Sequence, residues 1–298
     1  MISVVINTKN EEKNLPRALS SLKSFADEIV VVDMYSSDKT QEVARKAGAK
    51  VYQYQDMDYV EPARNFAVGK AKGEWIFVLD ADEELPESLR RKLIELIKRD
   101  EKSFYRLPRK NLIFGKWIKH SRWWPDYQIK FFKKGSVTWP EEIHAVPETR
   151  GVGKDLEARE ENAVMHHNYQ SVSQYLERLN RYTTIQVKEK QKKGETFSLA
   201  KLFESPTQEF LSRYFAGQGY KDGLHGLILA ILQAFSEFVV WLKLWQAEGF
   251  PERPITAVEF KQISKKFSRD YRYWQKEREI QEVGFVEGLF LKLKRRFF

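Results

Sequence analysis

Trp75-Ile76-Phe77-Val78-Leu79-Asp80-Ala81-Asp82-Glu83-Glu84 is the stretch that decides the fold of this chain. Apolar residues rich in β-formers run directly into a cluster of carboxylates, which is typical of a buried parallel strand with acids at its carboxyl end. Ligands bind at that end in open α/β sheets. Two aspartates one residue apart suit Mg²⁺ or Mn²⁺ shared with substrate phosphates. The alternative is an acid-rich helix N-terminus, because Pro86-Glu87 can open a helix at Leu89.

The flanking sequence repeats the same strand-then-helix rhythm. We expect strands at residues 3–6, 28–33, 49–54 and 75–82, and helices at residues 15–25, 40–47, 62–71 and 85–99. Such alternation predicts βαβ units and a mostly parallel sheet with helices on both faces. The polar ends of the strands then gather on one edge. The chain has neither a G-x-G-x-x-G after its first strand nor a P-loop motif, which argues against a dinucleotide Rossmann enzyme and a P-loop NTPase.

The pattern changes twice further along the chain. Residues 104–137 are strand-like and aromatic, with an alternating strand at 128–133, and the pattern is helical from residue 171 onward. We therefore predict an α/β domain at residues 1–170 and a helical region at residues 171–298. Residues 224–244 reach membrane-spanning length but carry His225, Gln233 and Glu237, which favours a buried or membrane-surface helix over a transmembrane one.

Composition narrows the class of protein. The 298 residues are 42% hydrophobic and 31% charged, which predicts a folded globular chain. The lack of cysteine excludes disulfides and thiolate metal sites. A net charge of +9 fits phosphate-rich ligands, an anionic membrane surface or nucleic acid. The basic residues are not clustered with base-stacking aromatics, so we do not expect nucleic acid as a partner. The first residues resemble a strand without a signal peptide, which favours the cytoplasm.

Several motifs occur together in a fixed order. They are Val4 to Glu11, Val30-Val31-Val32-Asp33 with Ser36 to Thr40, Ala63-Arg64-Asn65, and Leu79-Asp80-Ala81-Asp82. This set resembles the family 2 inverting glycosyltransferases, which have the GT-A fold. Further motifs resemble the bacterial branch that contains lipopolysaccharide core β-1,4-glucosyltransferases: Trp123 to Gln128, Phe131-Phe132-Lys133, Glu142-Ile143-His144, His166 to Ser171, and Tyr220 to Gly223.

The resemblance implies a donor site for a nucleotide-sugar, most simply a UDP-sugar. It implies that Asn7, Thr8, Lys9 and Asp33 hold the base and ribose, and that Arg64 contacts the base or diphosphate. An arginine fork suits a phosphate. The alternatives are a helix cap for Asp33 and a surface ion pair for Arg64.

Negative charge builds on the diphosphate as it leaves the donor, and a positive charge is needed to neutralise it. A bound Mg²⁺ or Mn²⁺ can neutralise it. We assign Asp82 as the direct metal ligand of this DXD motif, with Asp80 bonded to ribose or to the metal through water. His166 matches a late histidine that many such enzymes place on the metal or diphosphate. The alternative is a packed histidine bonded to backbone.

Inversion needs one base to deprotonate the acceptor hydroxyl. Glu142 is the first candidate, with Glu141 and Asp126 behind it. The branch often has a glutamate directly after the histidine matched by His144, but here Ala145 stands there, so this position supplies no base. The Glu-Glu pair after Pro140 could equally be a solvated turn.

The acceptor side and the C-terminal region complete the prediction. Trp123 and Trp124 cannot both be core in an alternating strand, so one is expected to face an acceptor cleft. Residues 285–298 combine an apolar stripe with cations, which favours docking on the anionic inner face of the cytoplasmic membrane over a helical lid. We predict sugar transfer to a saccharide on a lipid carrier or lipopolysaccharide core. Transfer to a peptide, or nucleotide-sugar binding without catalysis, is the alternative.

Overall fold

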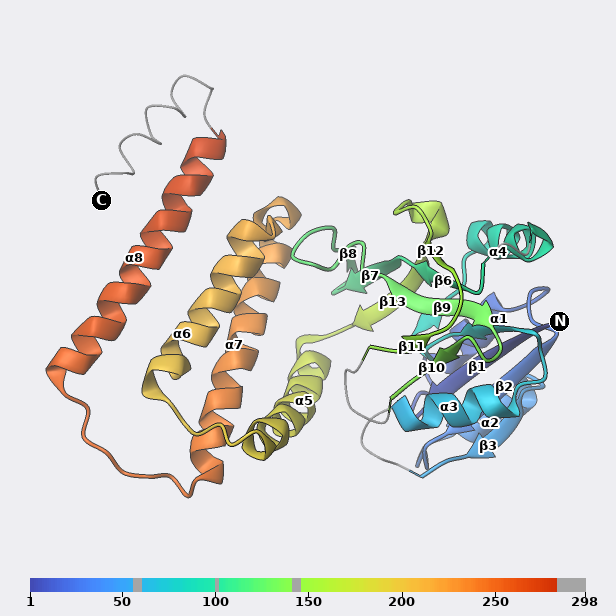
Figure 1. The fold of residues 1–298 in the computed structure, drawn as a ribbon, viewed down its shortest axis with the longest axis horizontal. Helices are drawn as coiled ribbons and strands as arrows, with labels where there is room; N and C mark the ends of the chain where they lie inside the picture. Colours follow the sequence, from blue (N-terminus) through green and yellow to red (C-terminus); the bar gives the residue numbers. More distant parts are fainter. Residues whose placement is uncertain (56–60, 100–101, 141–145, 283–298) are drawn as a thin grey trace. The chain divides into compact units, whose positions relative to one another are not determined.

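The computed structural model describes residues 1–55, 61–99, 102–140 and 146–282. The chain divides into two compact units (Figure 1). The first unit comprises residues 1–117 and 123–168, and the second comprises residues 118–122 and 169–298. Each unit is described separately below.

A seven-stranded sheet forms the centre of the first unit. Its strands lie in the order β12 (Gly153–Asp155), β6 (Phe104–Leu107), β9 (Gln128–Lys133), β4 (Trp75–Val78), β1 (Ile2–Thr8), β2 (Glu28–Asp33) and β3 (Lys50–Gln53). The four strands β4, β1, β2 and β3 are mutually parallel, whereas β9 runs antiparallel to both β4 and β6. The sheet is therefore mostly parallel at the edge that carries the predicted donor residues.

Helices cover both faces of this sheet because its central strands are apolar on both sides. Val4 and Ile6 pack with α1 (Leu15–Ser21), α2 (Thr40–Lys46) and α4 (Glu87–Arg99), whereas Val5 packs with α3 (Glu61–Lys70) on the other face. Strand β4 divides in the same way, with Trp75 and Phe77 on one face and Ile76 and Val78 on the other. The continuous apolar run that predicted a buried parallel strand is explained by this double burial.

The strand predicted at residues 75–82 is shorter than expected. It ends at Val78, and residues 80–83 form a turn in which the Glu83 N–H donates to the Asp80 carbonyl at 2.9 Å. Acidic side chains favour this turn because they can accept hydrogen bonds from nearby backbone N–H groups. The chain then enters β5 (Glu83–Glu84) before α4 begins.

A second sheet places later residues beside that turn. It has four strands in the order β5, β13 (Val164–Tyr169), β7 (Arg109–Ile113) and β8 (Lys116–Trp117). Strand β13 pairs antiparallel with β5, so that His166 lies opposite Glu83. The remaining pieces of the unit are the β10 (Val137–Thr138) and β11 (Glu148–Thr149) pair and a short 3₁₀ helix at Glu160–Asn162.

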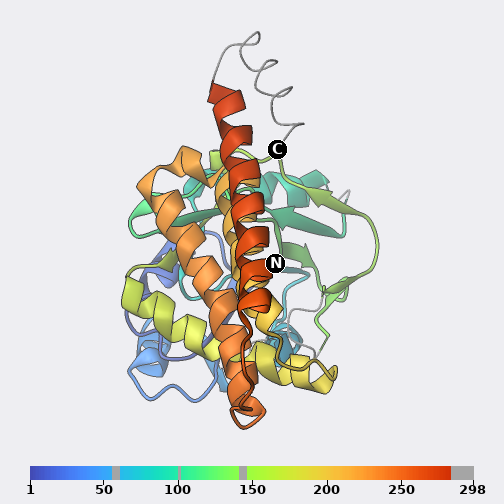
Figure 2. The same ribbon diagram turned by 90° about the vertical axis from the view of Figure 1, so that its left-hand side faces the viewer.

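The second unit is helical, as the sequence pattern predicted. It contains α5 (Val172–Lys192), α6 (Leu199–Leu211), α7 (Leu224–Ala247) and α8 (Ala257–Glu282), with a short π-helical segment at Ser212–Ala216 and a 3₁₀ turn at Gly219–Asp222 (Figure 2). Helix α7 packs against α5 and α6. Val187, Val240, Trp241 and Leu244 form a small core there. The Asp222 carboxylate accepts the backbone N–H of His120 at 2.9 Å, which joins residues 118–122 to this unit.

Helix α7 is the one helix, among the residues that the structure describes, whose length and composition would allow it to cross a membrane. Only 28% of its most apolar window is buried. Leu224, Ile228, Ile231 and Phe235 are exposed at successive spacings of four, three and four residues, so they lie on one face of the helix. Residues 285–298, the second apolar stripe predicted to dock on a membrane, lie outside the described residues.

Candidate active site

The carboxyl ends of β1 and β2 bring three of the predicted donor residues together. Asn7 pairs with Val32 and Thr8 with Asp33 in the parallel ladder, and all three polar side chains are buried. One Asp33 oxygen accepts from the Ser36 N–H at 3.0 Å and from the Gln41 amide at 2.8 Å. Its other oxygen, the Asn7 amide and the Thr8 hydroxyl have no hydrogen-bond partner among the described residues. Buried polar atoms without partners are costly, so this edge is suited to a polar ligand such as a nucleoside. Lys9, another predicted donor residue, directly follows Thr8 in the chain.

The end of β4 places Asp80 between two cations. The Lys130 ammonium lies 2.7 Å from Asp80 Oδ2, and an Arg64 guanidinium nitrogen lies 3.1 Å from Oδ1. Burial by itself would raise the pKa of Asp80, but Lys130 and Arg64 outweigh it and hold that pKa below its ordinary value. Arg64 is mostly buried, so the alternative of a surface ion pair does not apply.

Lys130 is a site residue that the sequence did not reveal. Its side chain is 1% exposed, and its ammonium also lies 2.6 Å from Oε2 of the fully buried Glu83. The same Glu83 oxygen accepts the Asp80 N–H at 2.9 Å. Lys130 therefore closes the turn at residues 80–83 by joining its first and last carboxylates. The available signal was a lysine within a strand at the centre of the sheet, where an ammonium must be paired with an acid.

Asp82 and His166 lie close together at one end of the β5–β13 pairing. His166 Nε2 lies 3.5 Å from Asp82 Oδ1, and both side chains are buried. Asn111 uses its NH₂ group to donate to the Trp123 carbonyl at 2.8 Å and to Asp126 at 3.1 Å. Its amide oxygen is thus left to accept from His166 Nδ1 at 2.7 Å. Nε2, which faces Asp82, is the ring nitrogen left for a further ligand, and the ring is bonded to a side chain, not to backbone.

This pair fits a divalent cation that is completed by a substrate. A carboxylate oxygen and an imidazole nitrogen 3.5 Å apart can bind neighbouring positions of one ion. A hydrogen-bonded Nδ1–H is the usual support for a metal-binding histidine. Within the described ranges, no group of three or more His, Asp and Glu side chains is arranged around one point. Substrate phosphates and water would have to supply the remaining ligands, as they commonly do for Mg²⁺.

The neighbouring histidine is already engaged. His167 Nε2 lies 2.9 Å from Glu84, which also pairs with Arg17 at 2.8 Å. Burial and the nearby Arg17 lower the pKa of His167 despite the glutamate. His167 is therefore a neutral hydrogen-bonding group that fastens β13 to β5.

Comparison with known proteins identifies the family. The model of glycosyl transferase family 2 matches residues 3–155, which is more than half of the chain. The chain belongs to glycosyl transferase family 2. It is accordingly an enzyme of the glycosyltransferase class, and its mostly parallel sheet with a helical C-terminal region confirms the predicted GT-A fold class.

Several glycosyltransferases are similar over most of their length. An uncharacterized glycosyltransferase of Rickettsia typhi is 29% identical over 254 residues, covering 82% of this chain and 86% of its own. The lipopolysaccharide core biosynthesis glycosyltransferase LpsC of Rhizobium meliloti is 27% identical, covering 85% of this chain and 95% of its own. Among solved structures, residues 1–349 of S. aureus TarS in complex with UDP give a TM-score of 0.45 at 15% identity, covering 86% and 94% of the two chains.

Of the three candidate bases in this glycosyltransferase, two lie outside the described residues, namely Glu141 and Glu142. Asp126 is described. It accepts from Arg109 at 2.6 Å, from Asn111 at 3.1 Å and from Gln128 at 3.2 Å. Burial would raise the pKa of Asp126, but Arg109 and these hydrogen bonds leave it lowered. A carboxylate stabilised in this way is a weak proton acceptor.

The two tryptophans predicted to meet the acceptor lie outside the strands, with Trp124 in a turn and Trp123 directly before it. They precede β9, and the Trp124–Pro125 peptide bond is cis. Trp124 packs its ring edge-to-face with Trp117 at 5.1 Å, and both Trp123 and Trp124 are half-buried. The alternation argument therefore does not apply to them, and their contact with an acceptor stays a prediction.

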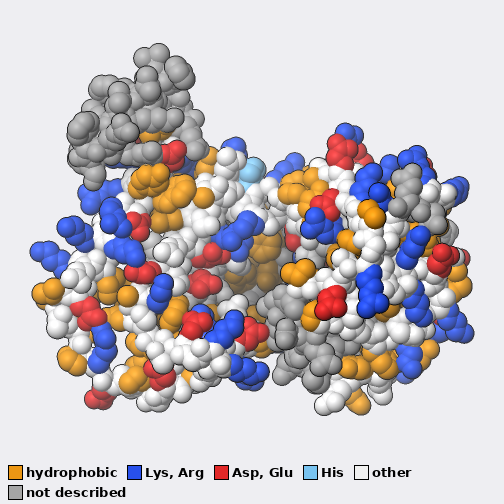
Figure 3. Space-filling view, viewed as in Figure 1, with side chains coloured by type: hydrophobic (Ala, Val, Ile, Leu, Met, Phe, Trp, Pro, Cys, Tyr) orange, Lys and Arg blue, Asp and Glu red, His pale blue; other side chains and the backbone are white. Residues whose placement is uncertain are grey.

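The charged surface of the glycosyltransferase is mixed. On the face in Figure 3, Lys and Arg side chains are interspersed with Asp and Glu over both units.

Proposed function

We propose that this enzyme transfers a sugar, with inversion, from a nucleotide-sugar to a saccharide on lipopolysaccharide core or on a lipid carrier. The observation that carries the proposal is the Asp82–His166 pair, oriented by Asn111 beside the donor edge of the sheet. Similarity to LpsC over most of both chains supports the lipopolysaccharide acceptor. A UDP-sugar is the first donor to test.

In this proposal Asp82 and His166 hold a Mg²⁺ or Mn²⁺ ion, which would neutralise the departing diphosphate. Asn7, Thr8, Lys9 and Asp33 bind the base and ribose, supported by the unpartnered polar atoms at that edge. Asp80 remains ionised beside Arg64 and Lys130, so it can accept a ribose hydroxyl or a metal-bound water. Arg64 would have N–H groups available for the diphosphate.

The base that activates the acceptor hydroxyl is proposed to be Glu142, followed by Glu141. Asp126 ranks last because its carboxylate already accepts hydrogen bonds from three side chains, including the Arg109 ion pair. Glu142→Gln should therefore lower turnover far more than Asp126→Asn does. Only Glu142→Gln should change the acidic limb of the pH–rate profile, because the general base sets that limb.

The central test is Asp82→Asn, with Glu95→Gln on the exposed side of α4 as a matched control. We expect the variant to lower turnover of a UDP-sugar at least 100-fold, which is the usual scale for loss of one charge-stabilising group. The part of the UDP thermal shift that requires Mn²⁺ should also vanish, whereas the control keeps both. Full activity of Asp82→Asn, or of the wild type in chelator, would contradict the metal role.

The same assay separates the alternatives. A metal-dependent UDP shift without turnover on any saccharide or peptide would indicate a binding protein that lacks catalysis. Turnover on peptides alone would indicate protein glycosylation. A shift with GDP, CMP or dTDP but none with UDP would change the donor class.

We further propose that the enzyme acts at the cytoplasmic face of the membrane as a peripheral protein. Two features support this proposal: the exposed apolar face of α7, and the apolar stripe with cations at residues 285–298. Replacing Ile231 and Phe235 by serine, or deleting residues 285–298, should lower binding to vesicles that contain anionic lipid. Unchanged binding in both variants would reject membrane docking.

A further inference from the structure

A cavity of about 880 Å³ lies in the first unit beside Arg64. It is lined by residues of β12, β6 and β9. These three strands are neighbours in the sheet (Figure 1). Its volume is within the range of pockets that take small molecules. The side chains that matter below are Arg64, Arg106, Tyr127, Trp139, Lys154 and Asp155.

The cavity and the polar residues proposed to bind the nucleoside lie on opposite sides of β4. In the sheet order, β9 and β6 lie on one side of β4, whereas β1 and β2, with Asn7, Thr8 and Asp33, lie on the other. Arg64 joins the two regions, since it lines the cavity and also contacts Asp80 at 3.1 Å. A molecule in the cavity would therefore meet the donor at the end of β4 without competing for the nucleoside atoms.

Two aromatic rings in the cavity wall are held in place and flanked by cations. Tyr127 donates its hydroxyl to the Leu156 carbonyl at 2.8 Å, with the Arg106 guanidinium 5.9 Å from its ring centre. The Trp139 backbone is bonded at both its N–H and its carbonyl by the Asn65 side chain, at 2.9 and 2.6 Å. The Arg64 guanidinium lies 5.8 Å from the Trp139 ring centre. Trp139 is only 5% exposed, whereas Tyr127 is partly exposed, so Tyr127 is the ring on which the C–H face of a sugar can pack.

The charges in the cavity select the kind of sugar. Arg106 is bonded to Asp155 through two nitrogens at 2.6 Å, so that acid is already matched. Lys154 is exposed and forms no ion pair with any described residue. Arg64 is likewise matched, by Asp80, so Lys154 provides the unmatched positive charge that faces the cavity. Phosphate and carboxylate groups are the natural partners of such cations.

We propose that this cavity binds an acceptor saccharide that carries a phosphate or carboxylate group, a proposal that rests on the glycosyltransferase function above. The sugar ring packs on Tyr127, and the anionic group is bound by Lys154, with Arg106 beside it. Trp123 and Trp124, the predicted acceptor contacts, precede Tyr127 in the same loop but do not line this cavity.

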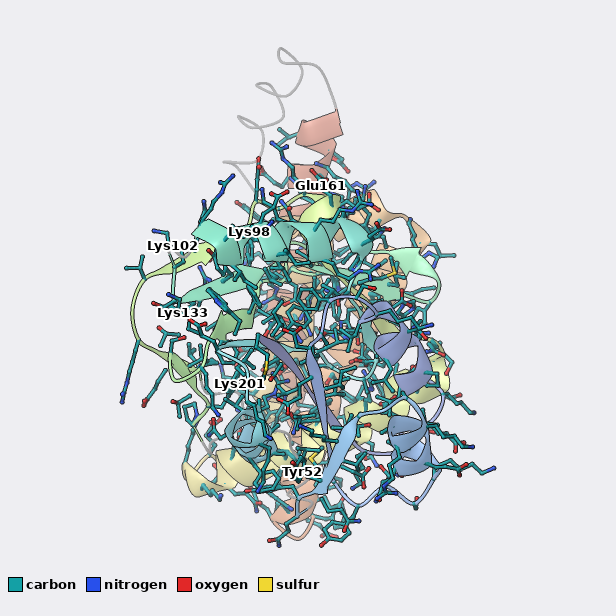
Figure 4. All side chains as sticks on the ribbon, turned by 90° about the vertical axis from the view of Figure 1, so that its right-hand side faces the viewer. Tyr52, Lys98, Lys102, Lys133, Glu161 and Lys201 are labelled. Carbon is teal, nitrogen blue, oxygen red and sulfur yellow. The ribbon has the colours of Figure 1, made fainter. Side chains whose placement is uncertain are left out.

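The test uses four probes on the full chain: glucose 6-phosphate, glucuronate, methyl glucoside and inorganic phosphate, each measured by ligand-detected NMR. We expect the two anionic sugars to bind at least 10-fold more tightly than methyl glucoside. Lys154→Ala should remove most of that preference without weakening the neutral sugar. The matched control is Lys98→Ala, whose side chain lies at the periphery of the unit on α4 (Figure 4). It should change nothing.

Two results would overturn the proposal. Equal affinity for charged and neutral sugars would remove the anionic selectivity. Inorganic phosphate binding as tightly as glucose 6-phosphate would show an ion site to which the ring adds nothing. Tyr127→Leu provides a second check, because it should weaken all three sugars and leave phosphate unaffected. The UDP thermal shift of the wild type reports separately on the proposed function, so failure of one can be told from failure of the other.

Discussion

Replacing Lys130 by methionine should destabilise the first unit more than replacing any other polar residue of β9. Methionine keeps most of the side-chain volume but removes the ammonium that lies 2.7 Å from Asp80 and 2.6 Å from Glu83. Glu83 is fully buried, and its remaining cation, Arg109, is 3.6 Å away. Removing one partner from a buried ion pair typically costs about 3–5 kcal/mol, because the other charge stays buried without compensation.

The structure places the expected loss toward the lower end of that range. Arg64 still faces Asp80 and Arg109 still faces Glu83, so neither carboxylate loses every cation. We expect a loss of about 3 kcal/mol, equivalent to a fall in Tm of roughly 10 °C for a unit of this size. Urea unfolding followed by tryptophan fluorescence measures it, with an unchanged m-value as the sign that only stability has altered.

Two further variants make the reasoning refutable. Lys133→Met is the matched control on the same strand, where the ammonium lies over the Trp75 ring at 5.7 Å, and its loss should cost less than about 1 kcal/mol. Lys130→Met combined with Glu83→Gln removes both charges and should recover about half of the loss, since contacting sites are coupled. A Lys130→Met variant within about 1 kcal/mol of wild type would refute the buried-pair account.

Three other predictions concern acid stability, the histidine support and the donor edge. Glu28 is buried, but hydrogen bonds from Lys50, Ser3 and the Lys72 N–H bring its pKa to about 2 from 4.5. Because the folded pKa is the lower one, its contribution of about 3 kcal/mol to the free energy of unfolding is present above pH 4.5 and is lost as pH falls toward 2. Glu28→Gln should therefore flatten the profile of stability against pH in that range. Asn111→Ala should weaken Mn²⁺ binding roughly 10- to 100-fold in a titration with UDP present, whereas Asn162→Ala, on the exposed 3₁₀ helix, should not; equal effects would refute the role of Asn111 as the support of His166. Asp33→Asn should raise the Kd for UDP at least 10-fold by calorimetry, and an unchanged Kd would remove Asp33 from the donor site.

Local pattern was sufficient to predict the secondary structure around the donor edge. The strand at residues 28–33 has the predicted bounds, and α2, α3 and α4 differ from prediction by one or two residues at their ends. These elements are readable because apolar period and helix-ending residues act over a few positions of the chain. Parallel βαβ order then brings Asn7, Asp33 and Asp80 to one edge whatever the details of packing. The end of β4 was predicted wrongly because the acidic turn follows the apolar run directly, and no Gly or Pro marks the point where the strand ends.

Tertiary structure decided which of these residues act as a group. Local sequence was enough for the fold class, the family resemblance and the polar residues that follow the strands, since each depends on neighbours in the chain. Only the antiparallel pairing of β13 with β5 puts His166 opposite Glu83 and thus 3.5 Å from Asp82. Only the place of β9 next to β4 turns Lys130 into the partner of two carboxylates. The pairing of β9 with β6 likewise brings Asp126 beside Arg109. Such pairings join residues tens of positions apart, and they are set by strand register and burial, for which no short stretch of sequence carries the signal.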